Sequence, residues 1–431
     1  MFEIKPMNIA VLGSGGREHA LAYQLSLSKY CKNIFVVPGN GGISLEFECI
    51  DWDQKNTTRL LEILKSLKID FAVIGPDQML SDGVADFLSE NGISVFGPSK
   101  KASEIEWSKI FAKELMTSVG VLTSSYMILR SESDFGLAAK TCGGYPLVVK
   151  YDGLALGKGV GVCHSKAEAL EFFNELKKQY GIDAKIFAEA LLTGSEVSLF
   201  ALTDGEEYVL FDPACDHKRL GERNTGPNTG GMGAFSSVPW FATKTAASMA
   251  EQIFPPVLRA LKKQGRRYQG LLYAGLMVHR NQYNVLEFNA RFGDPETQCL
   301  VPRLQCDLLP FLVAATRTDG SLQKLKNTNL WKFSDQYCVN VVATAFGYPQ
   351  TPRKGDEIKV SKIPDHSKIY FAATRLVEKK LYTNGGRVLS VSAMGDTLDE
   401  ARISAYEGLQ AIEFKDSYVR GDIAFSGDYH D

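Results

Sequence analysis

Several features that mark other classes of protein are missing from this 431-residue sequence. No apolar run approaches the length of a membrane span, and the first residues, MFEIKPMNIAVLG, lack a signal-peptide pattern. The eight cysteines are scattered, with no CxxC pair and no disulfide-like density, and the six histidines show no HExxH or other metal spacing. We therefore expect reduced, mostly buried thiols in a cytoplasmic protein without membrane contact, and no zinc site.

A surplus of either charge is also missing. The formal net charge of -2 gives no footprint for nucleic acid or an anionic membrane, although a local basic pocket for a small phosphate ligand remains compatible with it. The chain is 45% hydrophobic and 23% charged, which is typical of a globular protein. Its length exceeds what one hydrophobic core usually supports, so we expect about two to four domains.

The first hundred or so residues alternate between strand-like and helix-like segments. The apolar runs NIAVLG, NIFVVPG, DFAVIGP and ISVFGP are separated by helical stretches such as EHALAYQLSLS and NTTRLLEILKSL. This alternation predicts a doubly wound α/β domain with a mainly parallel sheet. Ligands of such folds bind at the carboxyl ends of the strands, which here lie at residues 13–19, 38–42 and 75–77.

Two of these strand ends are glycine-rich loops, GSGGREH at 13–19 and PGNGG at 38–42. The first loop superficially resembles a dinucleotide fingerprint, but PGNGG stands where an acidic residue is expected, which argues against a nicotinamide cofactor. Backbone N–H groups, a helix N-terminus and Arg17 suit a single phosphate and its sugar better. The alternative is that both loops are only tight strand-to-helix turns.

Two lysines of the next region have the setting expected of residues that bind nucleotide phosphates. Lys150 ends the apolar strand PLVVK and is therefore fixed, whereas Lys158 lies in the glycine-rich loop 152–159, which could close over a ligand. The alternative is a surface hairpin with two solvated lysines. That alternative fits less well, because the apolar residues of PLVVK indicate a buried strand, and a lysine at the end of a buried strand needs a binding partner.

The stretch VLEFNARFGDPETQ, 285–298, combines a strand with a cluster of polar groups. Side chains alternate between faces along a strand, so Glu287, Asn289 and Arg291 would project from the same face. A carboxylate, an amide oxygen and a guanidinium suit a divalent metal and the phosphates bound to it. The alternative is an edge strand with a wet polar face.

The other segments are assigned from their patterns. GLLYAGLMVHR and QYNVLEFNAR are predicted to pair as a hairpin; the second is called the metal strand below, because it carries the predicted metal ligands. Further strands are expected at SYMIL, PLVVK, KIFAEAL, YCVNVVATAFG, KIYFAATR and RVLSVSAMG. Residues 212–236 show no helix or strand period and predict a long functional loop, with disorder as the alternative. Helices are predicted at about 103–118, 167–179, 242–264 and after Thr397, and a polar linker at 320–332. Residues 384–387 predict a tight hairpin turn, with the alternative that Arg387 faces a ligand.

Eight strings occur in the order and spacing of one known family: GSGGREHAL, PGNGG, KYDGLALGKGV, DHKR, GPNTGGMGA, YAGLM, EFNARFGDPETQ and TNGGRVLSV. From residue 7 to about residue 420 the chain resembles the phosphoribosylamine–glycine ligases, members of the ATP-grasp superfamily. The resemblance implies a multidomain α/β and α+β fold. Its parts would be an N-terminal parallel-sheet domain (1–106), an ATP-grasp core of two α+β lobes (107–325, small lobe about 124–193) and a small C-terminal α+β domain (333–431).

The resemblance also implies a reaction. ATP would phosphorylate the carboxylate of glycine, and the amine of 5-phosphoribosylamine would attack the acyl phosphate, as in purine biosynthesis. The expected cofactors are ATP and Mg²⁺ or Mn²⁺, and the expected partners are these small molecules, with no nucleic acid and a monomeric or weakly dimeric state. A loop that excludes water would protect the acyl phosphate.

Residue roles follow from the matching positions. The metal ligands would be Glu287 and Asn289, and the residues at the reacting groups would be Arg291, Lys150 and Asp294. ATP would be held by Lys109, Lys150, Asp152, Gly153, Lys158, Gly159, Glu189, Leu191, Leu192 and Glu196. The substrates would be held by Gly15, Gly16, Arg17, Asn40, Gly41, Asp77, Asp216 and Lys218. Glu296 would receive an ammonium group or order its turn.

The chain departs from the family pattern at a few positions. Asp77 to Leu80 replaces the usual GPE-PL continuation, Trp107 replaces a glycine, and Cys215 replaces a glutamine before DHKR. The hinge reads Glu189-Ala190 instead of an acid pair, and GSE replaces GEE at 194–196. An ATP-grasp ligase with a different acid or amine is therefore an alternative. A non-catalytic nucleotide-binding protein is a weaker one, because Glu287, Asn289 and Arg291 are all present.

Overall fold

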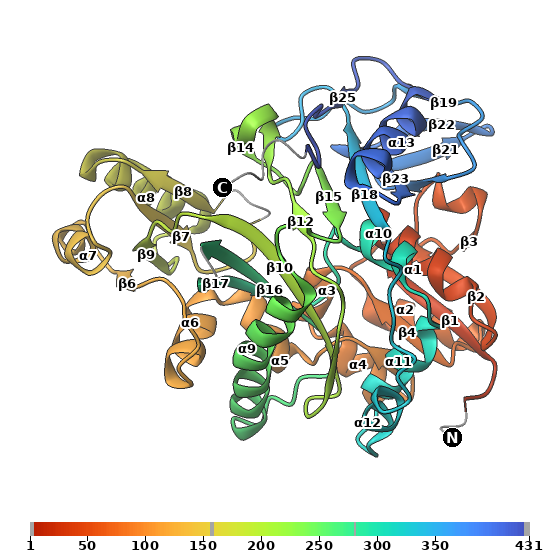
Figure 1. The fold of residues 1–431 in the computed structure, drawn as a ribbon, viewed down its shortest axis with the longest axis horizontal. Coiled ribbons are helices and arrows are strands. Elements are labelled where there is room, and N and C mark those ends of the chain that lie inside the picture. The colour runs from red at the N-terminus through yellow and green to blue at the C-terminus, as the bar shows by residue number, and fades with distance from the viewer. Residues whose placement is uncertain (1–3, 156–158, 280–281, 426–431) are drawn as a thin grey trace.

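The computed structural model describes residues 4–155, 159–279 and 282–425. A central antiparallel sheet is surrounded by the N-terminal sheet, a small lobe and the C-terminal sheets (Figure 1). The mixed α/β and α+β architecture predicted from the sequence is confirmed. Within the described part of the chain, no helix is both long enough and apolar enough to cross a membrane.

The N-terminal sheet is entirely parallel, as predicted. Across the sheet its strands are β3 (Glu48–Cys49), β2 (Cys31–Pro38), β1 (Met7–Gly13), β4 (Phe71–Ile74) and β5 (Ser94–Phe96). Its helices are α1 (Gly16–Ser26), α2 (Thr57–Ser66), α3 (Asp77–Ser81) and α4 (Val84–Glu90). Ile9 and Val11 share a core with α1, whereas Ala10 and Leu12 share another with α2 and α4, because alternate side chains of a strand face opposite sides.

The helical segment predicted at about 103–118 is confirmed, but it consists of two helices. The chain forms α5 (Lys100–Trp107) and α6 (Lys109–Ser118), which meet at Ser108. The extended backbone of Ser108 ends α5, and its hydroxyl accepts a hydrogen bond from the N–H of Phe111 at 3.2 Å, which caps α6. A capping serine inside an otherwise helical pattern therefore marks two helices.

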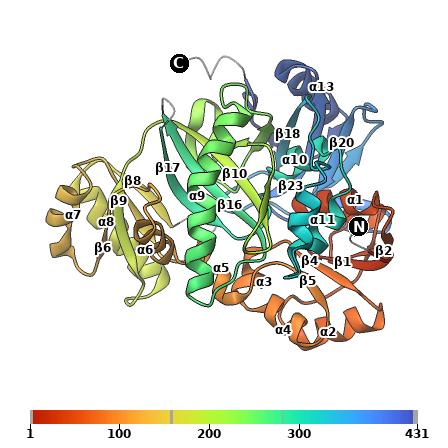
Figure 2. The same cartoon turned by 60° about the horizontal axis from the view of Figure 1, so that its bottom comes forward.

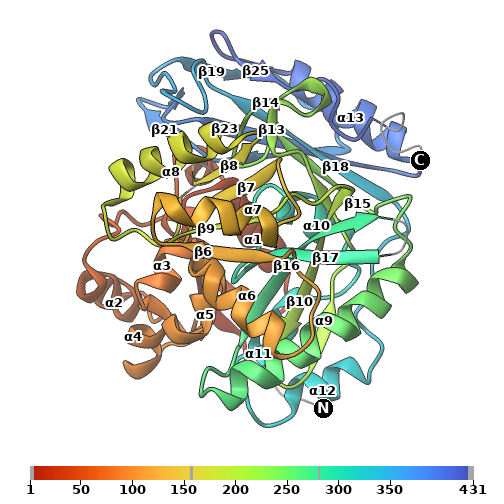
Figure 3. The same ribbon diagram turned by 90° about the vertical axis from the view of Figure 1, so that its left-hand side faces the viewer.

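The small lobe is a four-stranded antiparallel sheet covered by two helices, and it faces the viewer in Figure 3. Its strands are β6 (Tyr126–Leu129), β9 (Ile186–Ala190), β7 (Leu147–Tyr151) and β8 (Val160–Cys163), and its helices are α7 (Phe135–Thr141) and α8 (Lys166–Tyr180). Phe135 and Phe173 of these helices pack on Val149 and Ala188 of the sheet in a core of their own.

The central sheet carries the metal strand at its edge. Its strands, in order, are β11 (Tyr208–Leu210), β10 (Ser195–Thr203), β16 (Gly270–His279) and β17 (Gln282–Asn289). The predicted pairing of β16 with β17 is confirmed, and α9 (Thr243–Lys263) runs along this sheet (Figure 2). The hinge into the small lobe continues the edge, because the N–H of Val285 donates to the carbonyl of Leu122 at 2.8 Å.

Residues 212–236 do not form the predicted irregular loop. They contain four short strands, β12 (Cys215–Asp216), β13 (Arg219–Gly221), β14 (Thr225–Asn228) and β15 (Gly233–Ser236). β13 pairs with β14, and β15 pairs with β18 (Tyr337–Thr344), about a hundred residues later. Strands of two to four residues show no period of their own, so a distant partner decides their conformation.

The C-terminal region contains two sheets. The larger one has the order β12-β15-β18-β23-β20 with β25 on β18, so it includes strands from both the 107–325 and the 333–431 segments (Figure 1). Its additional strands are β20 (Ser367–Phe371), β23 (Arg387–Gly395) and β25 (Tyr418–Val419), and it packs against α13 (Leu398–Gln410). The smaller sheet contains β21 (Thr374–Val377), β22 (Lys380–Thr383), β19 (Glu357–Val360) and β24 (Ile412–Glu413).

Two local predictions in this part of the chain are wrong. Residues 384–387 are not a hairpin turn, because β22 and β23 lie in different sheets. The predicted linker at 320–332 contains α12 (Ser321–Lys326), whose Leu322 is buried in the core that also holds α11 (Leu308–Ala315). Its polar composition reflects one exposed helix face. The short α10 (Thr297–Leu300) follows the metal strand.

Candidate functional site

The polar face of β17 lies in a strongly cationic environment. Glu287 and Asn289 are half-buried on either side of the buried Phe288, so they share one face as predicted. Burial alone would raise the pKa of Glu287, but its attraction to the cations Lys218, Lys150, Lys109 and Arg291 is stronger, and the pKa is lowered. The structure therefore brings residues from four segments to one carboxylate.

The donor set of this face suits a divalent cation that also contacts an anionic ligand. Among the described residues, no group of three or more His, Cys, Asp or Glu side chains is arranged to hold a metal by itself. A cation held by Glu287 and Asn289 would take its other oxygen ligands from a bound nucleotide and water, which is the usual arrangement for Mg²⁺. The Nε of Arg291 is buried and has no hydrogen-bond partner within the described part of the chain, so one donor remains for an anion.

Arg291 is held by a residue that the sequence analysis missed. Glu106 of α5 forms an ion pair with Arg291, with Oε1 at 3.1 Å from Nη2, and accepts a hydrogen bond from the N–H of Ala290 at 2.8 Å. Glu106 is buried, which raises its pKa, and the charge of Arg291 opposes that shift. Arg291 Nη2 also contacts Asn289 Oδ1 at 3.3 Å, so Glu106 orients both groups. A single acid in a helix has no sequence signal that would distinguish it from surface residues.

Lys113, which was not predicted, forms a buried charge trio with Glu189 and Lys150. Glu189 of β9 contacts Lys150 Nζ at 2.5 Å and Lys113 Nζ at 2.6 Å, and it accepts from Ser124 Oγ at 2.8 Å. Burial opposes ionisation of Glu189, but the charges of Lys150 and Lys113 outweigh it and lower its pKa to about 2. One carboxylate therefore compensates two lysines, and the trio keeps a net positive charge. In the sequence, Lys113 is one more cation in an amphipathic helix.

The start of the predicted nucleotide loop is fastened to α6. Lys109 Nζ donates to the carbonyl of Gly153 at 3.0 Å, and Asp152 accepts from the N–H of Ile110 at 3.0 Å and from the Ser108 hydroxyl. At the other end, the carbonyl of Gly159 accepts from the N–H of Tyr151 at 2.8 Å. Lys158 lies outside the described residues.

Residues near the hinge and in DHKR form a second charged cluster. Lys218 Nζ lies 2.6 Å from Glu196 Oε2 and 4.0 Å from Asp216 Oδ1. Burial raises the pKa of Asp216 to about 7, because Lys218 only partly offsets burial and the neighbouring carboxylates. Leu191 and Leu192 directly follow β9, and Leu191 is exposed. Their predicted contacts with adenine stay predictions.

The first glycine loop accommodates an acidic side chain that the sequence analysis passed over. Glu18 is buried, accepts from the N–H of Gly15 at 2.5 Å and lies 2.6 Å from Arg17 Nε. A Cβ on Gly75 would lie 1.8 Å from Glu18 Oε1. Arg17 also donates to the carbonyl of Phe292 at 3.0 Å. Some glycines here therefore make room for Glu18.

The second glycine loop packs against the C-terminal region. The amide of Asn40 donates to the carbonyls of Ser14 and Phe371, both at 3.0 Å, and accepts from the Thr374 hydroxyl at 2.8 Å. The N–H of Gly41 donates to the carbonyl of Thr374 at 3.1 Å. A Cβ on Gly41 would lie 2.2 Å from the backbone nitrogen of Leu376. These contacts occupy the side chain of Asn40 and the N–H of Gly41, two of the groups assigned to a phosphate; the roles of Gly15, Gly16 and Arg17 stay predictions.

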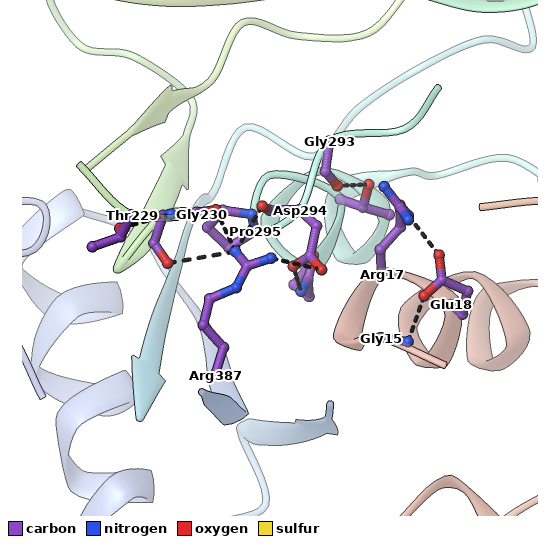
Figure 4. A network of polar contacts seen from close by, with 12 residues as sticks. Gly15, Arg17, Glu18, Thr229, Gly230, Gly293, Asp294, Pro295 and Arg387 are labelled. Atoms are coloured by element: carbon purple, nitrogen blue, oxygen red, sulfur yellow. Dashed lines mark hydrogen bonds and ion pairs between the residues drawn. The ribbon is translucent and has the colours of Figure 1, made fainter. Parts of the chain in front are cut away.

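The turn after the metal strand lies between the N-terminal loop and the C-terminal sheet (Figure 4). Asp294 contacts Arg387 Nη2 at 3.1 Å and accepts from Gln298 Nε2 at 2.8 Å. Burial opposes its ionisation, but Arg387 and Arg17 lower its pKa. Glu296 is buried, and a Cβ on Gly293 would lie 2.5 Å from Glu296 Oε2, which fits a role in ordering the turn.

Asp77 lies at the first turn of α3, where its carboxylate accepts from the N–H of Gln78 at 3.0 Å. Its charge opposes ionisation of Glu106 and favours the charged form of Arg291. Asp77 is therefore close enough to influence the metal strand. Its contact with a substrate stays a prediction.

Comparisons with known proteins agree along the chain. The phosphoribosylglycinamide synthetase N domain matches residues 7–106, the ATP-grasp (A) domain 107–297 and the C domain 338–426. The phosphoribosylamine–glycine ligase of Rhodopirellula baltica is 40% identical over 428 residues, covering 97% of each chain.

Solved structures give the same result. The crystal structure of phosphoribosylamine–glycine ligase from Thermotoga maritima superposes with a TM-score of 0.80 at 31% identity, covering 96% of this chain and all of that one. The biotin carboxylase domain of 2-oxoglutarate carboxylase from Hydrogenobacter thermophilus, in complex with MgADP, has a TM-score of 0.71 at 14% identity, covering 97% and 92%. The second likeness supports the fold alone.

Proposed function

The chain belongs to the phosphoribosylglycinamide synthetase family, and from this premise we propose that it joins glycine to 5-phosphoribosylamine through a glycyl phosphate. As a member of that family it is an ATP-dependent carbon–nitrogen ligase of purine biosynthesis. In the proposed sequence the glycine carboxylate takes the γ-phosphoryl group of ATP and ADP leaves. The amine then attacks the acyl carbon, phosphate leaves, and the amine loses a proton as the amide forms.

The metal strand would position the phosphoryl donor. Glu287 and Asn289 would hold Mg²⁺ or Mn²⁺, which when bound neutralises phosphate charge and aligns the transferred group. Arg291, oriented by Glu106, would place its guanidinium on the acyl-phosphate oxygens. The cations that act on Glu287 support this assignment, because lysine and arginine side chains suit a polyphosphate.

The small lobe and the hinge would hold ATP. Lys109, Lys150 and Lys158 would contact phosphates, with Asp152 to Gly159 as the covering loop. Glu189, Leu191 and Leu192 would contact adenine, and Glu196 the ribose. The charge trio of Glu189, Lys150 and Lys113 supports the assignment of Lys150, because Glu189 holds its ammonium group at 2.5 Å and the charge of Glu287 also acts on it.

The N-terminal loop and the DPE turn would hold the acceptor. Gly15, Gly16 and Arg17 would bind the phosphoribosyl group, and Asp294, Asp216 and Lys218 would line the side where the amine and glycine meet. Asn40 and Gly41 would act through the shape of their loop, since their hydrogen-bonding groups are used by the C-terminal region. We further propose a cytoplasmic enzyme that is a monomer or a weak homodimer.

The observation that carries the proposal is the convergence of Lys109, Lys150, Lys218 and Arg291 on Glu287. The test is phosphate release by the purified protein with ATP and Mg²⁺. We expect release that needs glycine and phosphoribosylamine together. Release that does not need glycine, or an equal rate with a different amine, would favour the alternative of another ATP-grasp ligase, which the Asp77 departure motivates.

A further inference from the structure

Arg387 connects three segments that are far apart in the sequence and meet at the acceptor side of the site. It is the first residue of β23 in the C-terminal sheet. Its Nη1 donates to the backbone carbonyl of Asp294 at 2.8 Å and to the carbonyl of Gly230, and its Nη2 lies 3.1 Å from Asp294 Oδ2. Figure 4 shows the guanidinium between the loop after β14 and the turn after β17.

The Asp294 carboxylate is held from more than one side. Arg387 contacts one oxygen and Gln298 Nε2 the other, at 2.8 Å. The first glycine loop lies beside it, because a Cβ on Gly15 would be 3.3 Å from Asp294 Oδ2. The charged groups that act on it are Arg387, Arg17 and Arg291. An arginine fork that binds both the carboxylate and the carbonyl of one residue fixes its orientation as well as its charge.

The loop contacted by Arg387 is fixed to the C-terminal region as well. The N–H of Gly230 donates to Tyr348 Oη at 2.9 Å, and a Cβ on Gly231 would lie 2.4 Å from Pro295. The loop and the turn therefore touch, and the same guanidinium binds both. Removal of Arg387 would loosen Asp294 and this loop together, whereas among the described residues Lys109, Lys150 and Lys218 form no hydrogen bond or ion pair with Arg387 or Asp294.

We propose that Arg387 is a positioning residue for the acceptor amine: it sets the place of Asp294 beside the Arg17 loop and thereby the affinity for 5-phosphoribosylamine. This rests on the proposed function, because Asp294 is there assigned to the acceptor side. The side chains of Arg387 and Asp294 are 22% and 17% exposed, so a ligand in the site can reach the pair. The C-terminal sheet thus contributes to substrate affinity without touching ATP.

The experiment compares Arg387→Met with Arg353→Met. Arg353 is a matched control, since it is another C-terminal arginine with carboxylate partners, Asp356 and Asp416, and no contact with the site. We expect Arg387→Met to raise KM for phosphoribosylamine about 10- to 100-fold, as for a lost charged hydrogen bond, while KM for ATP stays within about twofold. Arg353→Met should leave both KM values unchanged. An equal rise of both KM values in Arg387→Met would overturn the proposal.

A double-mutant cycle separates action through Asp294 from a general effect on folding. In an Asp294→Asn background, Arg387→Met should add little to the loss of kcat/KM for the acceptor, because the two residues act as a unit. Full additivity would contradict the proposal. If Arg387→Met does not fold, Arg387→Lys keeps the charge but not the fork, and it should show an intermediate KM for the acceptor. A KM equal to that of the wild type would also contradict it.

The pH dependence provides a readout that a purely structural role would not change. Since Arg387 lowers the pKa of Asp294, its removal should move the acid limb of kcat/KM for the acceptor to higher pH.

Product formation by the wild-type protein is measured first, because it separates the two proposals. If the wild type makes no glycinamide ribonucleotide, the proposed function fails. If it does and Arg387→Met behaves like Arg353→Met, only the role of Arg387 fails.

Discussion

Around Glu287, charged side chains from distant segments act on one carboxylate, whereas around Gly41 the backbone is packed against another backbone. Both stretches were predicted to hold phosphate groups. In the first, the charges of Lys109, Lys150 and Lys218 act on one carboxylate and lower its pKa. In the second, the donors are already used by Phe371 and Thr374. A glycine admits close approach by any atom, so the motif alone does not say whether a ligand or the chain itself approaches.

The substitution Glu287→Gln is the sharpest test of the charged cluster around Glu287. We expect turnover to fall on the order of 100-fold or more, because a metal that neutralises phosphate charge contributes several kcal/mol to the transition state. The measurement is kcat with saturating ATP and Mg²⁺, together with a thermal melt to show an intact fold. Glu357→Gln, at an exposed ion pair with Lys380, is the control. Near-normal turnover would refute the metal assignment.

Arg17→Ala tests whether the first of the two glycine-rich loops, at 13–19, binds phosphate. We expect KM for phosphoribosylamine to rise about 10- to 100-fold, the loss of a charged hydrogen bond, with little change for ATP. Initial rates with each substrate varied in turn measure both constants. Arg59→Ala, at an exposed pair with Glu62, should change neither. Equal effects on the two substrates would count against the cradle.

Gly41→Ala tests the packing side of the comparison. The new Cβ would overlap the backbone of Leu376, so the free energy of unfolding should fall by about 2 kcal/mol, typical of an overpacked contact. Chemical denaturation measures this value. Gly136→Ala, inside α7 where a Cβ meets nothing within 4 Å, should stabilise slightly. If Gly41→Ala changes only KM for the acceptor, the loop binds substrate rather than the C-terminal region.

Lys113→Met tests whether the charge trio of Glu189, Lys150 and Lys113 contributes to ATP binding. Glu189 would keep Lys150 as a partner but lose the contact at 2.6 Å that fixes its second oxygen, so we expect KM for ATP to rise about tenfold. Lys262→Met, at an exposed pair with Glu206, is the matched control. A change in kcat alone would place Lys113 with the acceptor chemistry instead.

Asp216→Asn has the smallest expected effect and concerns stability. The pKa of Asp216 rises on folding from 3.8 to about 7. Between these two pH values the folded state keeps a proton that the unfolded state has lost. Stability from this group is present at low pH and is lost as pH rises towards 7. Asn carries no such cost, so the variant should be more stable on the order of 1 kcal/mol near pH 8 and unchanged near pH 4. A gain that is independent of pH would contradict the shift.

The sequence was informative where local pattern sufficed. The parallel N-terminal sheet, the β16–β17 pair and the shared face of Glu287 and Asn289 all follow from apolar runs and strand alternation. It was uninformative where a distant partner decides. β15 is a strand because β18 pairs with it, and Glu106, Lys113 and Glu18 matter because of what they contact. No local period encodes either kind of information.

The sheet shared by β15 and β18 has a consequence for how the chain is made. During synthesis β15 emerges about a hundred residues before β18. The backbone N–H and C=O groups of β15 that later pair with β18 therefore have no partner strand in the nascent chain. A ribosome-bound chain that ends near residue 330 should therefore offer an open strand edge to chaperones, and release of the last hundred residues should close it. The segment that contains β18 is therefore needed to cover this edge of β15.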